Sequence, residues 1–423
     1  NKEWREKVDK WVDEDCKEAY TLMKVEEKGN VHHSVSKGRM PNMLEEVEEA
    51  GKFWEGWWNK EGSKDVQECL KDFRSPLIGN TFSKEEMRGS GRSFKQSTAS
   101  VDGWHIRTLA EMPSDGLRCL GKLWQATEAA GDWPEWERMA ITYLIPKQSG
   151  EGTRPVTVFR SLFRWYGKLV AREAGTWAAN TAGHEVNNRK GRETLDATYR
   201  EQARAEARKR FGIISVEVGK DVKKAFEQVS RWILAIQGIG RNYPRRALWI
   251  SLMSYDWSRR MCLQGVLGKE IGSNIGIVAG SPFAVQELTV VMCKVIEHWR
   301  RAIPSGCISV HVDDIAISVW GRKVEEDQDR VLQAVKALDE VVEDTLGMKF
   351  SKEKTYIVQS QAGVVYGLVK AQLLEGELCK VGEYIRRLGV DHNLEGEVKK
   401  EGRVAVGRRL KGMGRGIRLR RIA

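Results

Sequence analysis

The chain has 423 residues, of which 41% are hydrophobic and 30% are charged. That balance is typical of a folded protein, and the length predicts two or three lobes rather than one domain. The net charge of +11 favours a polyanionic partner, and nucleic acid is the first candidate. The alternative is that the protein is basic but binds no polyanion. No apolar run is long enough to cross a membrane and no secretory signal opens the sequence, so we expect no membrane partner. Because it begins with Asn1 rather than Met, we expect a part of a longer protein.

The sequence contains seven cysteines, an odd number, and none of them belongs to a Cys-x-x-Cys pair. This pattern argues against a disulfide framework and against a zinc finger or knuckle, and it favours a reducing intracellular compartment. They are Cys16, Cys69, Cys119, Cys262, Cys293, Cys307 and Cys379.

The first half of the chain is expected to be mainly helical. Residues 1–75 are rich in Lys, Glu and Trp, which predicts helices with long polar faces and no chemistry of their own. The Gly, Ser and Lys cluster at 83–100 predicts a loop and a boundary. Helical stretches follow from Val101 to about Arg208, and one short apolar strand, Ile141–Ile145, interrupts them.

The second half of the chain mixes strands and helices. Alternating apolar and polar residues after Phe211 predict a strand that ends near Asp221. Apolar residues at helical spacing predict helices over 283–299 and 331–342, and Gly347 stands where a glycine would end the second helix. The order of these elements predicts an α+β fold.

The segment Ile308–Val319 is the most informative part of the sequence. Its apolar residues fall on even positions up to 312 and on odd positions from 315 onward. Such a change of phase is expected where two strands pair through a tight turn and face one core. Asp313 and Asp314 would then lie at the tip of a hairpin, although aspartate is also common in turns that have no catalytic role.

Asp221, at the end of the other predicted strand, favours a metal-binding role for Asp313 and Asp314 over a simple preference of aspartate for turns. It could meet Asp313 and Asp314 at one edge of a sheet, where three carboxylates would repel one another unless a cation joined them. Oxygen ligands together with substrate phosphates suit Mg²⁺, and Mn²⁺ could replace it. Two such ions can stabilise both the attacking and the leaving oxygen of an in-line displacement.

Four segments around these carboxylates resemble the palm motifs of reverse transcriptases. Asp221-Val-Lys-Lys-Ala-Phe-Glu-Gln-Val229 is similar to the first, in which an aromatic residue follows the aspartate by five positions. His311-Val-Asp-Asp314 resembles Tyr-x-Asp-Asp. Gly276-Ile-Val-Ala-Gly-Ser-Pro-Phe-Ala284 resembles Gly-x-Pro-Gln-Gly-Ser-x-x-Ser, and Gly347-Met-Lys-Phe-Ser-Lys-Glu-Lys-Thr355 resembles Gly-Leu-x-x-Asn-x-x-Lys-Thr.

Three further segments extend the resemblance to about residues 95–415 and point to the non-LTR retrotransposon branch. Leu144-Ile-Pro-Lys147 with Arg154-Pro-Val156 resembles that branch's finger motifs. Asp102-Gly-Trp-His105 resembles its Pro-Asp-Gly segment, and Tyr384-Ile-Arg-Arg-Leu-Gly-Val390 resembles the turn into the thumb. Each motif is weak alone, but their common order makes the resemblance specific.

The resemblance implies an RNA-directed DNA polymerase with a right-hand fold. The implied organisation is an N-terminal helical extension (1–95), fingers (96–210), a palm with interleaved finger segments (211–383) and the start of a thumb with a basic tail (384–423). The implied partners are an RNA template, a DNA primer or target DNA, and deoxynucleotides. For a eukaryotic element the implied compartment is the nucleus.

The resemblance also implies roles for individual residues. Asp221, Asp313 and Asp314 would be the catalytic metal ligands, and Phe226 would lie against the sugar of the incoming nucleotide. The other implied nucleotide-binding residues are Lys147 and Arg154 at the triphosphate, Gly280 and Ser281 at the floor of the site, and Lys354 as a proton donor to pyrophosphate. Core packing for Phe226 and solvated surface positions for the basic residues remain the alternatives.

Three positions depart from the family pattern. His311 replaces the usual Tyr or Phe, and Val278-Ala279 replaces Pro-Gln, which removes one nucleotide contact. A degenerate, non-catalytic nucleic-acid-binding remnant is therefore one alternative. An RNA-copying RNA polymerase is another, although Val312 stands where such enzymes usually carry glycine.

The end of the chain is strongly basic. With apolar residues between the cations, it predicts an amphipathic helix that contacts nucleic-acid phosphates, with a solvated tail as the alternative. The residues expected to bind are Arg403, Arg408, Arg409, Lys411 and Arg415.

Overall fold

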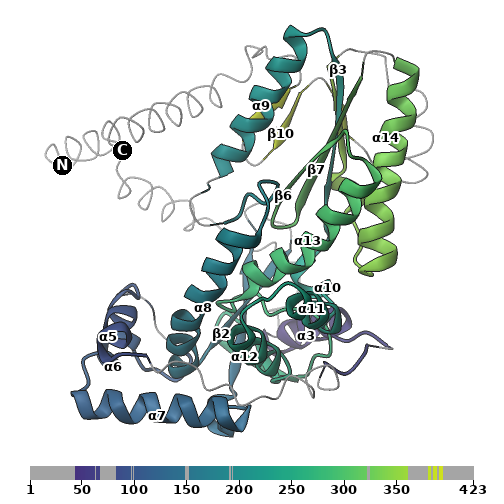
Figure 1. The fold of residues 1–423 in the computed structure, drawn as a ribbon. Coiled ribbons are helices and arrows are strands. Elements are labelled where there is room, and N and C mark those ends of the chain that lie inside the picture. Colours follow the sequence, from purple (N-terminus) through teal and green to yellow (C-terminus); the bar gives the residue numbers. More distant parts are fainter. Residues whose placement is uncertain are drawn as a thin grey trace, which may run out of the picture. The chain divides into compact units, whose positions relative to one another are not determined.

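The computed structural model describes residues 43–61, 63–66, 82–96, 98, 100–147, 152–189, 192, 194–321, 324–360, 380–382, 384–387 and 390–393. Contacts divide the chain after Glu46, and the fold described below is that of the second unit, Val47–Ala423. The structure combines helices with sheets whose strands pair mostly antiparallel (Figure 1). This mixture confirms the predicted α+β class. Among the described helices, none is both long enough and apolar enough to cross a membrane.

A five-stranded sheet carries the predicted carboxylates. Its strand order is β6-β7-β3-β8-β9, and only β8 and β9 pair in parallel. The hairpin predicted within 308–319 is confirmed as β6 and β7, and the strand predicted to end near Asp221 is confirmed as β3. The bounds are β3 (Ile214–Asp221), β6 (Cys307–His311), β7 (Asp314–Gly321), β8 (Tyr356–Gln359) and β9 (Lys380–Gly382).

Helices cover both faces of this sheet. Figure 1 shows α14 (Val324–Asp339) on one side of β3 and α9 (Thr194–Arg210) on the other, and α13 (Ala284–Ala302) packs against α14 and β6. The polar positions of the alternation in β3 are therefore not exposed: Glu217 is only 1% exposed. The hydroxyl of Tyr356 lies 3.2 Å from Oε1 of Glu217 and supplies the partner that a buried carboxyl group requires.

The helix predicted over 331–342 is confirmed, with an irregular end. α14 continues into a π-helical turn, Glu340–Thr345, and Gly347 follows with a φ of 66°. Glycine suits that position because other residues rarely adopt a left-handed backbone. The indole of Trp299 in α13 donates to the carbonyl of Ala334 at 2.9 Å and so joins the two helices.

The second sheet has four strands in the order β2-β1-β4-β5. The strand predicted over 141–145 is confirmed as β1, and the sequence reading missed β2, which pairs with it. From Val47 on, α3 (Met43–Trp58) buries Trp54 and Trp58 against Leu144, Met261 and other residues of this sheet. The strands are β1 (Ala140–Pro146), β2 (Thr153–Phe159), β4 (Arg259–Leu263) and β5 (Val266–Ile271).

The loop predicted over residues 83–100 is wrong in its first half, which forms α5 (Lys84–Arg92). Ser83 and Glu86 make a reciprocal capping box: the Glu86 amide donates to Oγ of Ser83 at 3.1 Å, and the Ser83 amide donates to Oε2 of Glu86 at 2.8 Å. Gly91 lies within this helix where a larger residue would not fit, because an added Cβ would be 2.5 Å from the Cβ of Ala110. Close packing, rather than flexibility, explains that residue.

The remaining described elements connect these layers. They are α6 (Ile106–Leu109), α7 (Ser114–Ala130), the 3₁₀ turn η2 (Glu135–Glu137), α8 (Ser161–Thr181), α10 (Ala225–Gln228), α11 (Arg231–Gly240), α12 (Arg245–Tyr255), the 3₁₀ turn η4 (Lys352–Lys354), and the antiparallel pair β10 (Tyr384–Arg387) and β11 (Val390–Asn393).

Candidate active site

The structure brings the three predicted aspartates together at one end of the five-stranded sheet. Asp221, the last residue of β3, lies directly opposite Asp314, the first residue of β7. Asp313 occupies the two-residue turn between His311 and Asp314, which are themselves paired. The amide of Val222 donates to the Asp313 carbonyl at 2.9 Å. The turn is thereby tied to the end of β3.

Val312, the other turn residue, has a left-handed backbone with a φ of 59°. A positive φ at the first loop position matches the twist of a two-residue hairpin, but glycine is the residue that adopts it freely. A β-branched side chain there stores strain of about 1–3 kcal/mol, which only a strongly determined surrounding structure can maintain. Val312 packs against the main hydrophobic core, and the Val222 contact holds its neighbour. The tip is therefore rigidly placed.

Burial raises the pKa values of both Asp221 and Asp313. For Asp221 the neighbouring Asp313 adds to that rise, while Lys354 and, more weakly, Lys147 oppose it. For Asp313 the charge of Lys354 again opposes the rise and the charge of Asp314 adds to it. Two partly desolvated carboxylates that repel each other favour the binding of a cation. The cation offsets both the cost of burying the charges and their mutual repulsion.

Lys354 is the cation that already lies there. Its Nζ is 2.8 Å from Oδ2 of Asp221, and the amide of Ser351 donates to the Asp221 carbonyl at 2.7 Å. The Lys354 side chain is 62% exposed, so it can leave this position at small cost. In the described part of the chain, no three Asp, Glu, His or Cys side chains already form a metal-binding cluster. Oxygen ligands of the kind that Mg²⁺ prefers are nevertheless present at Asp221 and Asp313.

Lys147 and Arg154 both belong to the hairpin of β1 and β2. Arg154 lies opposite Ile145, and Lys147 follows β1, where its amide donates to the Gly152 carbonyl at 3.1 Å. Both side chains are exposed. The charge of Lys147 lowers the pKa of Asp221, so this lysine is close enough to act on the carboxylates.

Gly280 lies against the backbone of β2. Its φ is 110°, and an added Cβ would be 2.1 Å from the Thr157 carbonyl oxygen. The amide of Thr157 also donates to the carbonyl of Ala279 at 2.7 Å. The segment that resembles the Gly-Ser motif and the segment that resembles a finger motif are therefore in direct contact, although more than a hundred residues separate them.

Ser281 does not direct its hydroxyl toward open space. The side chain is buried, and its Oγ lies 3.0 Å from the hydroxyl of Tyr255. Tyr255 also contacts Oε2 of the buried Glu287. Any contact of Ser281 with a substrate would therefore come from its backbone, and the side chain belongs to an interior network that sequence reasoning did not find.

Phe226 lies in α10, five residues after Asp221, and is partly buried against the main core. Its carbonyl accepts a hydrogen bond of 2.8 Å from the Ile277 amide, and the Gly276 amide donates to the Val229 carbonyl at 2.8 Å. These two bonds join the first predicted palm motif to the segment that contains Gly280. Partial burial leaves both the packing role and the sugar-contact role open for Phe226.

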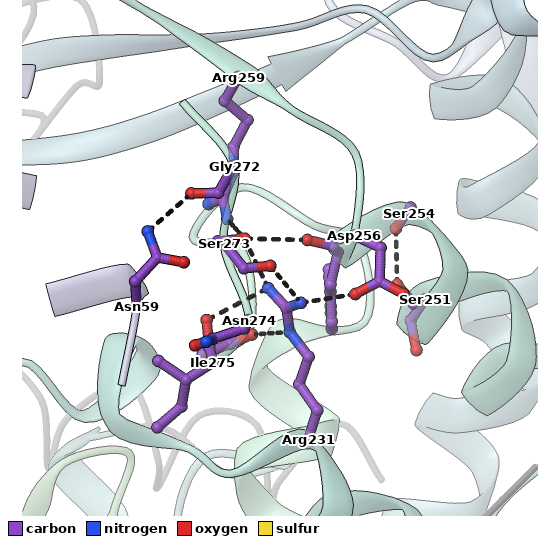
Figure 2. Close-up of polar contacts among 12 residues, drawn as sticks. Asn59, Arg231, Ser251, Ser254, Asp256, Arg259, Gly272, Ser273, Asn274 and Ile275 are labelled. Atoms are coloured by element: carbon purple, nitrogen blue, oxygen red, sulfur yellow. Dashed lines mark hydrogen bonds and ion pairs between the residues drawn. The ribbon is translucent and has the colours of Figure 1, made fainter. Parts of the chain in front are cut away.

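Arg231 is a further residue that sequence reasoning missed. Figure 2 shows its guanidinium at the centre of the 272–276 segment. It donates to the carbonyls of Gly276 and Ser273 at 2.9 Å each and forms an ion pair of 2.7 Å with Asp256. Burial lowers its pKa to about 10. An arginine at the start of the mostly apolar run 231–240 was the available signal, because a charged residue there needs partners.

The same segment is joined to α3. The amide of Asn274 donates to the Trp58 carbonyl at 2.9 Å. Figure 2 shows the second link, in which Nδ2 of Asn59 donates to the Gly272 carbonyl at 3.1 Å. Beyond it, Lys224 places its Nζ 3.7 Å from the centre of the Trp54 ring. The described part of α3 therefore contacts segments near the predicted site, and the expectation that residues 1–75 have no chemistry of their own stays a prediction.

Asp102, from the predicted Pro-Asp-Gly-like segment, has a structural role. Its Oδ2 accepts from the amide and the hydroxyl of Ser161, at 3.1 and 2.7 Å. The buried Glu137 accepts from the Phe163 amide at 2.9 Å. Two carboxyl groups from distant segments thus satisfy the first amides of α8.

The predicted phosphate-contacting tail, Arg403, Arg408, Arg409, Lys411 and Arg415, lies outside the described residues. The predicted turn into the thumb coincides with β10 and the start of β11, with residues 388 and 389 undescribed.

No protein-family model and no curated protein matches the sequence. Among solved structures, the chain is similar to apo telomerase from Candida tropicalis truncated from its C-terminal domain, with a TM-score of 0.45 and 14% identity over 72% of this chain and 63% of that chain. A second structure of apo telomerase from the same organism gives a TM-score of 0.44 and 13% identity over 69% of this chain and 54% of that chain. Its complex with a TWJ fragment of telomeric RNA gives 0.43 and 12% over 63% and 45%. The chain thus spans less than two thirds of each of these proteins, and the residues of its own site must carry any functional conclusion.

Proposed function

We propose that the chain is an RNA-directed DNA polymerase, the reverse transcriptase of a non-LTR retroelement. The observation that carries this proposal is the position of Asp221 directly opposite Asp314, with Asp313 in the adjoining two-residue turn. Around these carboxylates lie segments in the order that the family resemblance requires. In this assignment the five-stranded sheet is the palm, the β1–β2 hairpin belongs to the fingers, and the thumb begins near β10.

The proposed reaction joins a deoxynucleotide to the 3′-hydroxyl of a primer. Asp221 and Asp313, with Asp314 in support, would hold two Mg²⁺ ions, which supply charge stabilisation for the attacking and leaving oxygens. The carboxylates fit that use because they are partly desolvated and repel each other. Lys354, which lies 2.8 Å from Asp221, would have to leave that oxygen when a metal binds and would then be available to protonate the departing pyrophosphate.

The remaining residues would bind and orient substrates. Lys147 and Arg154 are exposed on one hairpin and suit the triphosphate as a point charge and a planar fork. Gly280 would allow a close approach of substrate to backbone, and Phe226 would lie beneath the sugar. The excess of basic residues, including the tail at 403–415, suits an A-like template–primer duplex that is recognised through its phosphates.

Primer extension tests this function and separates it from its alternatives. A DNA primer is annealed to matched RNA and DNA templates, and deoxynucleotides or ribonucleotides are supplied with Mg²⁺. Extension with deoxynucleotides on the RNA template supports the proposal. Extension of an RNA primer with ribonucleotides alone would assign an RNA polymerase, and template binding without any extension would assign a non-catalytic remnant.

A further inference from the structure

Three aromatic residues of α3 surround the ammonium group of Lys224. The Nζ lies 3.7 Å from the ring centre of Trp54, 4.8 Å from that of Phe53 and 5.4 Å from that of Trp57. We call these three residues the α3 aromatic face. A cation over aromatic rings is attracted by their electron-rich faces, most strongly by tryptophan.

The α3 aromatic face is held in place from behind. Trp54 is 3% exposed and packs with Trp58 against Leu144 of β1 and Met261 of β4. Phe53, by contrast, is 55% exposed although it is large and apolar. The face is thus a rigid surface at its Trp54 end and an open one at Phe53, and Lys224 lies over both.

Among the described residues, Lys224 has no ion-pair partner at its ammonium group. It is half-buried, and within the described residues its Nζ makes no hydrogen bond and no ion pair. Burial lowers its pKa to about 8, and the charges of Lys147 and Lys223 lower it further, against the opposing charge of Glu227. The three rings all belong to one helix and accept no conventional hydrogen bond, so the N–H donors of the ammonium group can still bind an anion.

The position of this ammonium suggests which anion. Lys224 follows Asp221 by three residues and has a left-handed backbone, with a φ of 47°. The amide of Val222, between Asp221 and Lys224, donates to the Asp313 carbonyl at 2.9 Å, which ties this segment to the carboxylates, and the charge of Lys147 acts on both Asp221 and Lys224. A lysine three residues beyond a metal-binding carboxylate is suited to the far end of a polyphosphate whose metal-binding end lies at the carboxylates.

We propose that Lys224 binds the polyphosphate of the incoming nucleotide and that the α3 aromatic face positions it for that contact. The inference rests on the proposed polymerase function and adds a substrate-binding residue to it. It also gives the N-terminal helix α3 a direct part in nucleotide binding. A purely structural cation–π contact between α3 and α10 would make a different prediction, namely lower stability with unchanged affinity for phosphate.

Binding of inorganic tripolyphosphate to the full chain, measured by calorimetry without metal, tests the site independently of catalysis. Lys224→Gln should weaken binding about tenfold, as expected for the loss of one charge-assisted contact, and Lys224→Arg should retain most of it. The matched control is Lys168→Gln, because the Nζ of Lys168 lies 4.0 Å from the Phe94 ring in another part of the chain. Phe53→Leu, at an exposed position, should weaken binding several-fold and avoids the risk that a Trp54 variant fails to fold.

Equal tripolyphosphate affinity in Lys224→Gln and the wild-type chain would overturn the proposal, as would an equal loss in Lys168→Gln. Steady-state primer extension supplies the second readout, in which Lys224→Gln should raise the nucleotide KM much more than it lowers kcat. If no variant polymerises but tripolyphosphate binding still depends on Lys224, the phosphate site stands and the proposed polymerase function fails. If the wild-type chain polymerises while binding is indifferent to Lys224, the function stands and this inference fails.

Discussion

The ammonium nitrogen of Lys354 lies 2.8 Å from Oδ2 of Asp221, the carboxylate that ends β3. A divalent cation at this carboxylate would lie close to the ammonium group and be repelled by it, so the ion pair opposes metal binding. The charge of the same lysine opposes the rise that burial causes in the pKa values of Asp221 and Asp313, so it favours the ionised carboxylates that a metal requires. Lys354 therefore acts on the proposed site in two opposing ways.

Lys354→Met separates those two effects. Without the competing ammonium, we expect Mn²⁺ to bind a few-fold more tightly, as measured by electron paramagnetic resonance of the free ion. If Lys354 protonates pyrophosphate, kcat should nevertheless fall by about 10²–10⁴-fold, the usual contribution of a general acid. Lys349→Met, at an exposed lysine of the same segment, is the control. A variant with wild-type kcat would assign Lys354 to the ion pair alone.

Asp313→Asn should abolish primer extension without unfolding the protein. The substitution removes a metal ligand, and we expect a loss of at least about 10²-fold in kcat. Because burial and Asp314 raise the pKa of Asp313, the neutral variant should melt at the wild-type temperature or slightly above it. Asp115→Asn, at a side chain that is 82% exposed, controls for the loss of charge alone. Near-normal extension by Asp313→Asn would remove this residue from the metal site.

Gly280→Ala should destabilise the fold strongly. The new Cβ would face the Thr157 carbonyl oxygen at 2.1 Å and would also impose a positive φ on an L-residue. We expect a loss of about 3 kcal/mol or more in the free energy of unfolding, measured by urea denaturation. Gly103→Ala is the matched control, since its φ is 75° but nothing lies within 4 Å, and it should cost only about 1 kcal/mol. Equal losses would show that the β2 contact is not tight.

Glu287 should make stability depend on pH. Burial raises the pKa of this carboxyl group from 4.5 to about 7. The Tyr255 hydroxyl contacts both Ser281 and Glu287 but has only one proton to donate. A protonated Glu287 can donate to the Tyr255 hydroxyl, which leaves the tyrosine proton for Ser281. A raised folded-state pKa adds stability below pH 4.5 that is lost as the pH rises through about 7.

Glu287→Gln should remove that dependence. Between pH 4.5 and pH 8 the wild-type chain should lose up to about 3 kcal/mol of stability from this group, and the variant should not. Urea denaturation at both pH values measures the difference. The control is Glu135→Gln at an exposed side chain, which should retain the wild-type slope. A variant with the wild-type slope would show that Glu287 is ionised at neutral pH.

Phe226→Ala tests sugar selection against core packing. If the ring excludes a 2′-hydroxyl by bulk, the variant should accept ribonucleotides about tenfold or more better, relative to deoxynucleotides, because about 1.4 kcal/mol corresponds to tenfold. If the ring is mainly core, stability should fall by about 3–5 kcal/mol instead and the two activities should fall together. Partial burial predicts some of both. The ratio of kcat/KM values, with the melting temperature, distinguishes them.

The sequence predicted the hairpin because a buried two-stranded tip imposes a change of phase on its apolar residues. The same reasoning placed Asp221 at a strand end, but pattern alone could not show that it lies opposite Asp314. That pairing depends on β7 lying beside β3, which is a long-range choice of the fold. The predicted roles of these residues remain predictions, because placement does not test chemistry.

Other features had local signals that composition concealed. Ser83 and Glu86 form a capping box whose spacing was visible, but the surrounding Gly and Ser suggested a loop. Arg231 and Lys224 gave no local sign of their partners. The ring of Trp54 is 170 residues away from Lys224 in the sequence, and only the packing of α3 on the four-stranded sheet brings them together. The sequence alone could not predict the partners of these charged side chains, because the partners come from distant segments.

The packing of α3 also limits how the protein can be shortened. A fragment that starts at residue 96, the boundary that the motifs suggest, would lack Trp54 and Trp58 and would expose Leu144, Met261 and Ile271 to water. A bare apolar sheet face of this kind favours self-association. A shortened chain that does not self-associate should therefore begin before Val47, even though every residue of the proposed chemistry other than the α3 aromatic face lies beyond residue 140.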